Sequence, residues 1–174
     1  MSSRLPDFVD PWRMADLGKV FSGYAAIVDL PRLAEAVSDV EGEVELRLVF
    51  DRDSGKRASI TGFVKANLVL ECQRCLSPMP ALVESELNIA LVRSTEEAER
   101  LPEQYDPLLL DEPRIRLLDI VEDELLLSLP QVPRHKEGEC CSDLNQATDQ
   151  PVADLEESDK RPNPFAILAE LKQK

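Results

Sequence analysis

Cysteine and histidine residues in two short stretches are the side chains of this sequence best suited to chemistry. The first stretch is a CxxC motif at residues 72–75, and the second contains His135, the only histidine, followed by Cys140 and Cys141. Thiolate sulfur and imidazole nitrogen are preferred zinc ligands, and a structural zinc site takes four ligands in a tetrahedron. The two stretches therefore predict one zinc site, provided that the fold brings them together. Its candidate ligands are Cys72, Cys75, Cys140 and either His135 or Cys141.

Adjacent cysteines such as Cys140 and Cys141 rarely bind one ion together, because consecutive side chains diverge.

Two other uses of these cysteines remain open. A redox dithiol is the first alternative, but a redox CxxC usually lies at a helix N-terminus that lowers its thiol pKa. In the second alternative, Cys72 is only a small buried apolar side chain and the other thiols have no role.

Other catalytic arrangements have weaker support. Without a metal, His135 is expected to be a solvated loop residue, because its neighbours are charged. The acids at 122–124 would point in different directions on a helix, which favours a solvated face. A nuclease would need carboxylates clustered around Mg²⁺. The candidates, by residue type alone, are Asp106, Asp111, Asp119 and Asp123.

The CxxC motif is expected in a turn of a β-meander. Apolar residues alternate with polar ones over 43–50, 59–71 and 81–93, which predicts three strands with one apolar face each. Continuing this alternation beyond the second strand places Cys72 on the buried face. Pro78 and Pro80 are expected to stop the pairing, because proline cannot donate to a ladder.

The remaining segments predict an α+β fold: an antiparallel β-meander or sheet of four or more strands with a few helices packed on it. Residues 1–16 show little periodicity. Further strands are expected within 17–30 and 106–110, and helices at 31–37, 94–101 and 117–129. In the last helix an apolar stripe containing Val121 and Leu125 should face the sheet, and Asp119, Glu122 and Asp123 should face water. We expect a single core domain over 1–133, an acidic flexible arm over 134–161, and a C-terminal helix over 162–174 that docks on the core.

Charge limits the choice of partners. The 174 residues include 34 acidic and 20 basic ones, for a net charge of −14. Such a surface repels phosphate backbones, and no basic stripe is visible along the chain, so a general nucleic-acid binder is not expected. A basic protein has the right sign. No signal peptide or membrane span is visible, and the expected location is the cytoplasm, where thiols stay reduced.

Several short strings, in the same order, resemble the bacterial YceD family, the large ribosomal RNA subunit accumulation proteins. The strings are LECQRC at 70–75, LVRS at 91–94 with EAERLPE at 97–103, VEDE at 121–124 with LPQVPRH at 129–135, and NPFA at 163–166 with Leu168 and Leu171. The similarity extends over about residues 15–174. It places Cys72, Cys75, His135 and Cys140 on the family's cysteine and histidine positions. Cys141 looks like an addition in this chain, which favours His135 or a water as any fourth ligand.

The resemblance implies a cytoplasmic, non-enzymatic factor for the synthesis, processing or stability of 23S ribosomal RNA and for large-subunit assembly. The family's genes commonly lie beside that of a large-subunit ribosomal protein. Direct binding of RNA would need a local basic patch, so we expect a basic ribosomal protein or assembly factor as direct partner and indirect contact with 23S RNA. The alternatives are a zinc-stabilised binding module and, with less support, an RNA-processing or thiol-redox enzyme.

Overall fold

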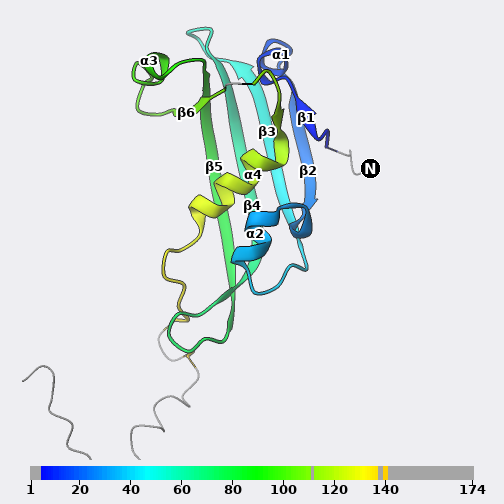
Figure 1. The fold of residues 1–174 in the computed structure, drawn as a ribbon, viewed down its shortest axis with the longest axis vertical. Helices are drawn as coiled ribbons and strands as arrows, with labels where there is room; N and C mark the ends of the chain where they lie inside the picture. Colours follow the sequence, from blue (N-terminus) through cyan, green and yellow to red (C-terminus); the bar gives the residue numbers. More distant parts are fainter. Residues whose placement is uncertain (1–4, 111, 137–138, 141–174) are drawn as a thin grey trace, which may run out of the picture. The chain divides into compact units, whose positions relative to one another are not determined.

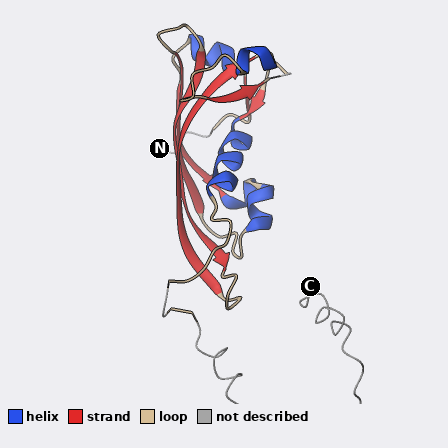
Figure 2. Cartoon of the chain, turned by 90° about the vertical axis from the view of Figure 1, so that its left-hand side faces the viewer, coloured by secondary structure: helices blue, strands red, loops and turns tan. Residues whose placement is uncertain are grey.

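The computed structural model describes residues 5–110, 112–136 and 139–140, and its main element is a five-stranded sheet (Figure 1). The elements in chain order are β1 (Phe8–Val9), α1 (Pro11–Asp16), β2 (Val20–Ala26), the 3₁₀ turn η1 (Ile27–Asp29), α2 (Pro31–Ala36), β3 (Glu43–Arg52), β4 (Ala58–Glu71), β5 (Pro78–Val92), α3 (Thr95–Ala98), β6 (Asp106–Leu109), β7 (Ile115–Arg116) and α4 (Leu117–Ser128). The strand order in the large sheet is β2-β3-β4-β5-β6. Helices α2 and α4 lie against one face of it (Figure 2). The α+β class is therefore confirmed.

The meander of β3, β4 and β5 confirms the alternation read from the sequence. Consecutive strands pair antiparallel, with Phe50 opposite Ile60 and Leu70 opposite Met79. The predicted inward side chains are buried on one face and form the core with α4. They are Val44, Leu46, Leu48 and Phe50 from β3, Ile60, Val64, Ala66, Leu68 and Leu70 from β4, and Val83, Leu87, Ile89 and Leu91 from β5.

The expectation that Pro78 and Pro80 stop the pairing is wrong. Strand β5 begins at Pro78, and Pro78 and Pro80 lie opposite Glu71 and Val69 of β4. Along this part of β5 no described strand pairs with the edge away from β4, because β6 pairs only with Ile89–Val92. Pro78 and Pro80 are two residues apart, so their backbone nitrogens point to the same side of the strand. Both nitrogens, which lack a hydrogen to donate, can therefore face the open edge, and no hydrogen bond between β4 and β5 is lost.

The expectation of a purely antiparallel sheet also needs correction, because β6 runs parallel to β5. The chain leaves β5, forms α3 and returns before it enters β6. Parallel neighbours need a crossover of at least about a dozen residues, and segment 93–105 supplies one. Ser94 caps α3 by accepting the N–H of Glu97, as its sequence predicts.

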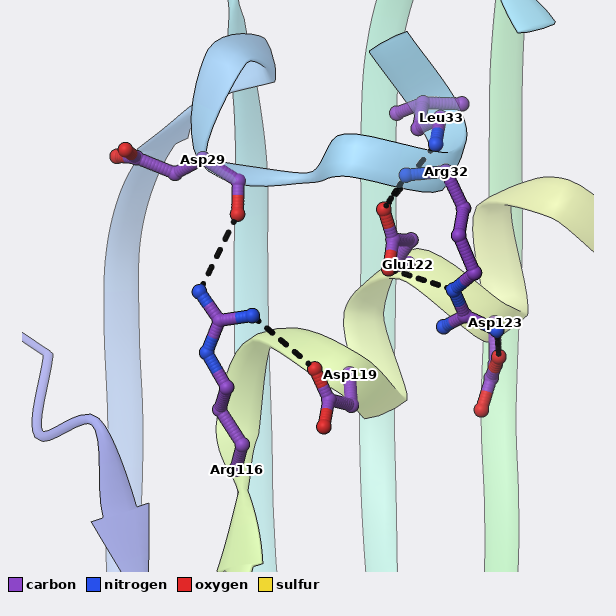
Figure 3. A network of polar contacts seen from close by, with 7 residues as sticks. All are labelled: Asp29, Arg32, Leu33, Arg116, Asp119, Glu122 and Asp123. Carbon is purple, nitrogen blue, oxygen red and sulfur yellow. Dashed lines mark hydrogen bonds and ion pairs between the residues drawn. The ribbon is translucent and has the colours of Figure 1, made fainter. Parts of the chain in front are cut away.

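Helix α4 packs its apolar stripe on the sheet as predicted, with Leu117, Val121 and Leu125 buried. The solvated position expected for Glu122 is wrong, since only 2% of this residue is exposed. Its carboxylate turns toward the N-terminus of α2, where it meets Arg32 and Leu33 (Figure 3). The neighbours Asp119 and Asp123 are exposed as expected.

The segment before β2 contains structure that the lack of periodicity did not indicate. Strand β1 pairs with β7, and α1 begins at Pro11 with Asp10 as its N-cap. The predicted strand within 17–30 is shorter, because η1 follows β2 directly. The helix expected from residue 163 and most of the arm over 134–161 lie outside the described residues. Within the described ranges, no helix has the length and apolarity needed to cross a membrane.

Candidate metal centre

The CxxC motif lies in the turn that joins β4 to β5, at one end of the long hairpin (Figure 1). The alternation along β4 brings Cys72 to the inner face, and this residue is fully buried. The turn closes through two backbone hydrogen bonds: the N–H of Cys72 donates to the carbonyl of Ser77 at 3.0 Å, and that of Leu76 to the carbonyl of Cys72 at 2.8 Å. Leu76 has a φ of 58°, a left-handed conformation that reverses the chain between the strands. This compact turn holds both sulfurs of the motif on one side.

The segment after α4 brings the second group of ligands to this turn. Helix α4 ends at Ser128, before Pro130 and Pro133. The carbonyl of Pro133 then accepts the backbone N–H of Gln73, inside the CxxC motif, at 2.9 Å. This contact fixes the chain two residues before His135, and the hairpin end and the post-helix segment meet there. The fold therefore brings together the CxxC stretch and the stretch that contains His135 and Cys140, as a shared metal site requires.

The four side chains form one compact cluster. The ligand atoms of Cys72, Cys75, His135 and Cys140 all lie within 4.8 Å of one another. The sulfurs of Cys72 and Cys140 are 3.7 Å apart. The Nδ1 atom of His135 lies 3.4 Å from the sulfur of Cys75 and 4.0 Å from that of Cys140.

These separations fit a tetrahedral zinc ion. Zn–S bonds of about 2.3 Å and Zn–N bonds of about 2.0–2.1 Å place two sulfur ligands about 3.8 Å apart and a sulfur and a nitrogen about 3.6 Å apart. The distances of 3.7, 3.4 and 4.0 Å lie around these values. A disulfide would need a separation of about 2.05 Å, so Cys72 and Cys140 are not bonded to each other. The donor set is therefore suited to a four-coordinate ion.

The electrostatics of the cluster also favour a cation. Burial alone would raise the pKa of Cys72, but the backbone N–H groups of His135, Arg74 and Cys75 point at its sulfur and lower the pKa to about 5. Burial, together with the neighbouring sulfurs of Cys75 and Cys72, raises the pKa of Cys140 to about 11. Hydrogen bonding to the sulfur of Cys72 raises the pKa of His135. A hydrogen bond from the backbone of Ser77 likewise lowers the pKa of Cys75. The thiolates of Cys72 and Cys75 are thus favoured while that of Cys140 is opposed, a conflict that a divalent ion would remove.

The chemistry of such a site is structural. Three sulfurs and one nitrogen complete a tetrahedron, which leaves no position for a substrate or a reactive water. A redox role has less support, because the motif lies in a turn between strands and not at the N-terminus of a helix. A bound ion would instead join the end of the β4–β5 hairpin to the chain that follows α4.

The structure thus brings together the four predicted ligands, and Cys141 lies outside the described residues. The expectation that His135 is a solvated loop residue is wrong, because it is half-buried among the cysteines. Sequence reasoning missed the contact between Gln73 and Pro133, and backbone hydrogen bonds of this kind leave no signal in residue types.

The carboxylates proposed for a nuclease do not gather in the described part of the chain. Asp119 pairs with Arg116 and Asp123 with Arg32, while Asp106 begins β6 and Asp111 is not described. Among the described residues, the Cys72, Cys75, His135 and Cys140 group is the one His, Cys, Asp or Glu cluster arranged to hold a metal ion.

These features define an α+β protein with a Cys₃His cluster at the end of a β-hairpin. The family model described as large ribosomal RNA subunit accumulation protein YceD matches residues 60–172. A protein of Haemophilus influenzae with the same description is 40% identical over 173 residues, which cover 98% of this chain and 98% of that protein. No solved structure matches the chain. The chain belongs to the YceD family, which confirms the resemblance in its sequence.

Proposed function

We propose that this chain is a non-enzymatic factor that supports the synthesis, processing or stability of 23S ribosomal RNA and the assembly of the large ribosomal subunit in the cytoplasm. The observation that carries the proposal is the 40% identity, over nearly the full length, to a relative named for accumulation of large-subunit ribosomal RNA. The match of the family model over residues 60–172 supports the same role.

The arrangement of the described side chains favours a role without catalysis. The metal-type cluster has a full set of four ligands, and it therefore suits a structural ion. The carboxylates that could have held Mg²⁺ are dispersed, and two of them, Asp119 and Asp123, are paired with arginines. A factor that binds and releases assembly partners needs neither an open metal position nor a nucleophile.

The direct partner in this proposal is a basic ribosomal protein or assembly factor. With 34 acidic and 20 basic residues, the chain carries a net charge of −14. Charge complementarity speeds association and selects partners more than it adds affinity, so an acidic factor meets cationic ribosomal proteins rapidly and releases them again. Most of the contact with 23S RNA then runs through the protein partner.

A zinc-stabilised binding module is the second candidate, and the cluster geometry favours it. Zinc at Cys72, Cys75, His135 and Cys140 would tie the β4–β5 turn to segment 133–140 and hold a shaped surface at this end of the hairpin. The two proposals are compatible, because a structural ion can stabilise an assembly factor.

Copurification from growing cells tests the main proposal. The chain is crosslinked to its neighbours, the lysate is divided, and one half is treated with nuclease before capture. We expect basic large-subunit proteins in both halves. In a parallel capture without crosslinking, their recovery should fall as the salt of the washes rises. Recovery of ribosomal proteins only from the untreated half would contradict the protein partner, and metal-dependent cleavage of 23S precursors by the pure chain would contradict the non-enzymatic role.

A further inference from the structure

A basic hollow of about 360 Å³ is lined by residues of α1, of α3 and its flanks, and of the turn between β3 and β4. These elements lie at the end of the sheet opposite to the turn between β4 and β5 that carries the CxxC motif (Figure 1). The volume of the hollow is within the range of roughly 300–1,000 Å³ common for ligand pockets. Five positive side chains, one carboxylate and one tryptophan line it together with apolar residues. These seven are Arg52, Lys56, Arg57, Arg93, Arg100, Glu97 and Trp12.

Positive charge remains in the hollow after its ion pairs are taken into account. Arg52 pairs with Asp16 at 2.6 Å and Arg57 with Asp53 at 2.8 Å. Counting these two acids and Glu97, five positive side chains face three negative ones. The three other cations are exposed and form no ion pair with any described residue; they are Lys56, Arg93 and Arg100. In a chain of net charge −14, this excess is local and unexpected.

The turn that carries Lys56 is held in shape by Asp53. The carboxylate of Asp53 accepts the backbone N–H and the Nε–H of Arg57, each at 2.8 Å, and the hydroxyl of Tyr105 at 3.3 Å. Burial opposes the ionised form, but these hydrogen bonds lower the pKa of Asp53 below its usual value. Arg52 also donates to the carbonyl of Lys56 at 2.7 Å. These hydrogen bonds fix the shape of the turn before a ligand binds, so less conformational entropy is lost on binding.

An aromatic ring lies beside these cations. The guanidinium of Arg93 is 4.6 Å from the centre of the Trp12 ring, a cation–π contact that orients both groups. Guanidinium and ammonium groups bind phosphate through charge-assisted hydrogen bonds, and aromatic rings and arginine planes stack on bases. Phosphate and a planar base occur together in a nucleotide unit.

We propose that this hollow binds a nucleotide unit of single-stranded RNA. The choice of RNA as the source of the nucleotide rests on the proposed function, and the hollow is the local basic patch that direct contact requires. The acidic surface elsewhere weakens this contact little, because charges separated by more than about 8 Å are largely screened at physiological ionic strength. The main partner can remain a basic protein while the hollow touches the RNA beside it.

Fluorescence of Trp12 provides a direct test, because it is the only tryptophan in the chain. The full-length protein is titrated with a short oligouridylate RNA, with uridine monophosphate, with inorganic phosphate and with polyglutamate. We expect saturable quenching by the oligonucleotide, with an affinity that falls between about 50 and 200 mM salt, by a log–log slope of about 0.7 for each phosphate contact. The double variant Lys56→Gln with Arg100→Gln should bind about tenfold or more weakly and show a smaller slope.

A matched control removes the same charges elsewhere. Arg47→Gln with Lys65→Gln deletes one arginine and one lysine from the middle strands β3 and β4, outside the hollow, and should bind RNA as the unchanged protein does. The proposal is overturned by absence of quenching, by equal losses in the two double variants, or by equal affinity for uridine monophosphate or polyglutamate. Copurification of ribosomal proteins would survive any of these results, so the two proposals fail separately.

Discussion

The carboxylate of Glu122, on α4, accepts the backbone N–H of Leu33, on α2, at 3.1 Å, across 89 residues of sequence (Figure 3). The same carboxylate accepts the backbone N–H of Arg32 at 2.7 Å and its Nε–H at 2.9 Å. Helix α2 has Pro31 in its first turn and Leu30 at its N-cap, and leucine cannot cap a helix. Glu122 therefore supplies from another helix the cap that the local sequence lacks.

Replacing Glu122 by alanine should destabilise the protein by about 2–4 kcal/mol, because two helix N–H groups lose their partner in a buried position. Urea denaturation followed by circular dichroism measures this change. Asp123→Ala is the matched control, since Asp123 pairs with the same Arg32 but is exposed; its loss should cost no more than about 0.5 kcal/mol. Equal costs for the two variants would show that the cap contributes nothing.

The stabilisation from Glu122 should depend on pH. Burial opposes the charged form, but the hydrogen bonds from Leu33 and Arg32 dominate and hold the pKa of Glu122 below its ordinary value. A group with a lowered folded-state pKa stabilises the fold above its unfolded pKa of about 4.3 and loses this contribution as the pH falls through the folded value. The difference in unfolding free energy between the unchanged protein and Glu122→Gln should therefore shrink below about pH 4. A difference that stays constant down to pH 3 would contradict this assignment.

Much of the fold could be predicted because alternation in a meander is a local signal. Val44 to Phe50 and Ile60 to Leu70 face the core as their period of two requires. The direction of β6 could not be read in this way, because it depends on how far the chain returns after α3. The burial of Glu122 could not be predicted either, since its hydrogen-bond partners lie on a helix about 90 residues away and no residue near Glu122 in the sequence indicates them.

The candidate metal site was visible because its residue types are rare and chemically specific. Cys72, Cys75, His135 and Cys140 could be grouped by ligand preference before the fold was known. The basic hollow could not be predicted, because Arg52, at the end of β3, lies far in sequence from Arg93 and Arg100, on either side of α3, and all three have acidic residues near them in the sequence. Only the sheet end brings them together.

Gly62 should tolerate no side chain. A Cβ atom at this position would lie 1.8 Å from the carbonyl oxygen of Arg47 on β3, and the φ of 153° is one that other residues rarely adopt. Gly62→Ala should therefore destabilise the fold by about 3 kcal/mol or more, or prevent folding, because the two strands must separate. Thermal unfolding and the yield of soluble protein report the effect.

Gly18→Ala provides the control for this prediction. Gly18 also has a positive φ, 57°, but nothing lies within 4 Å of its missing Cβ. Its substitution should cost only the left-handed strain, about 1 kcal/mol. Similar stabilities of the two variants would mean that β3 and β4 do not approach as closely at Gly62 as described.

Truncation of side chains in the sheet core should show which face of each strand is buried. Leu68 and Leu87 are 1% and 3% exposed, so Leu68→Ala and Leu87→Ala should each cost about 2–5 kcal/mol in unfolding free energy. Leu82, on the same strand as Leu87 but 59% exposed, should lose less than about 1 kcal/mol when it is truncated. An inverted order of these costs in urea denaturation would show that the faces of β5 are assigned the wrong way round.

Zinc at the cysteine cluster should be measurable as one ion per chain. Cys72→Ser removes the buried sulfur that lies 3.7 Å from Cys140, and we expect the metal content, measured by plasma mass spectrometry, to fall to near zero. Cys141→Ser should keep its zinc, because four ligands are already provided by the other residues. Loss of zinc in both variants would move Cys141 into the ligand set, and an unchanged content in Cys72→Ser would exclude this site.

Chelation should also speed hydrogen exchange at the N–H of Gln73, since its bond to the carbonyl of Pro133 joins the two segments that the ion would tie together.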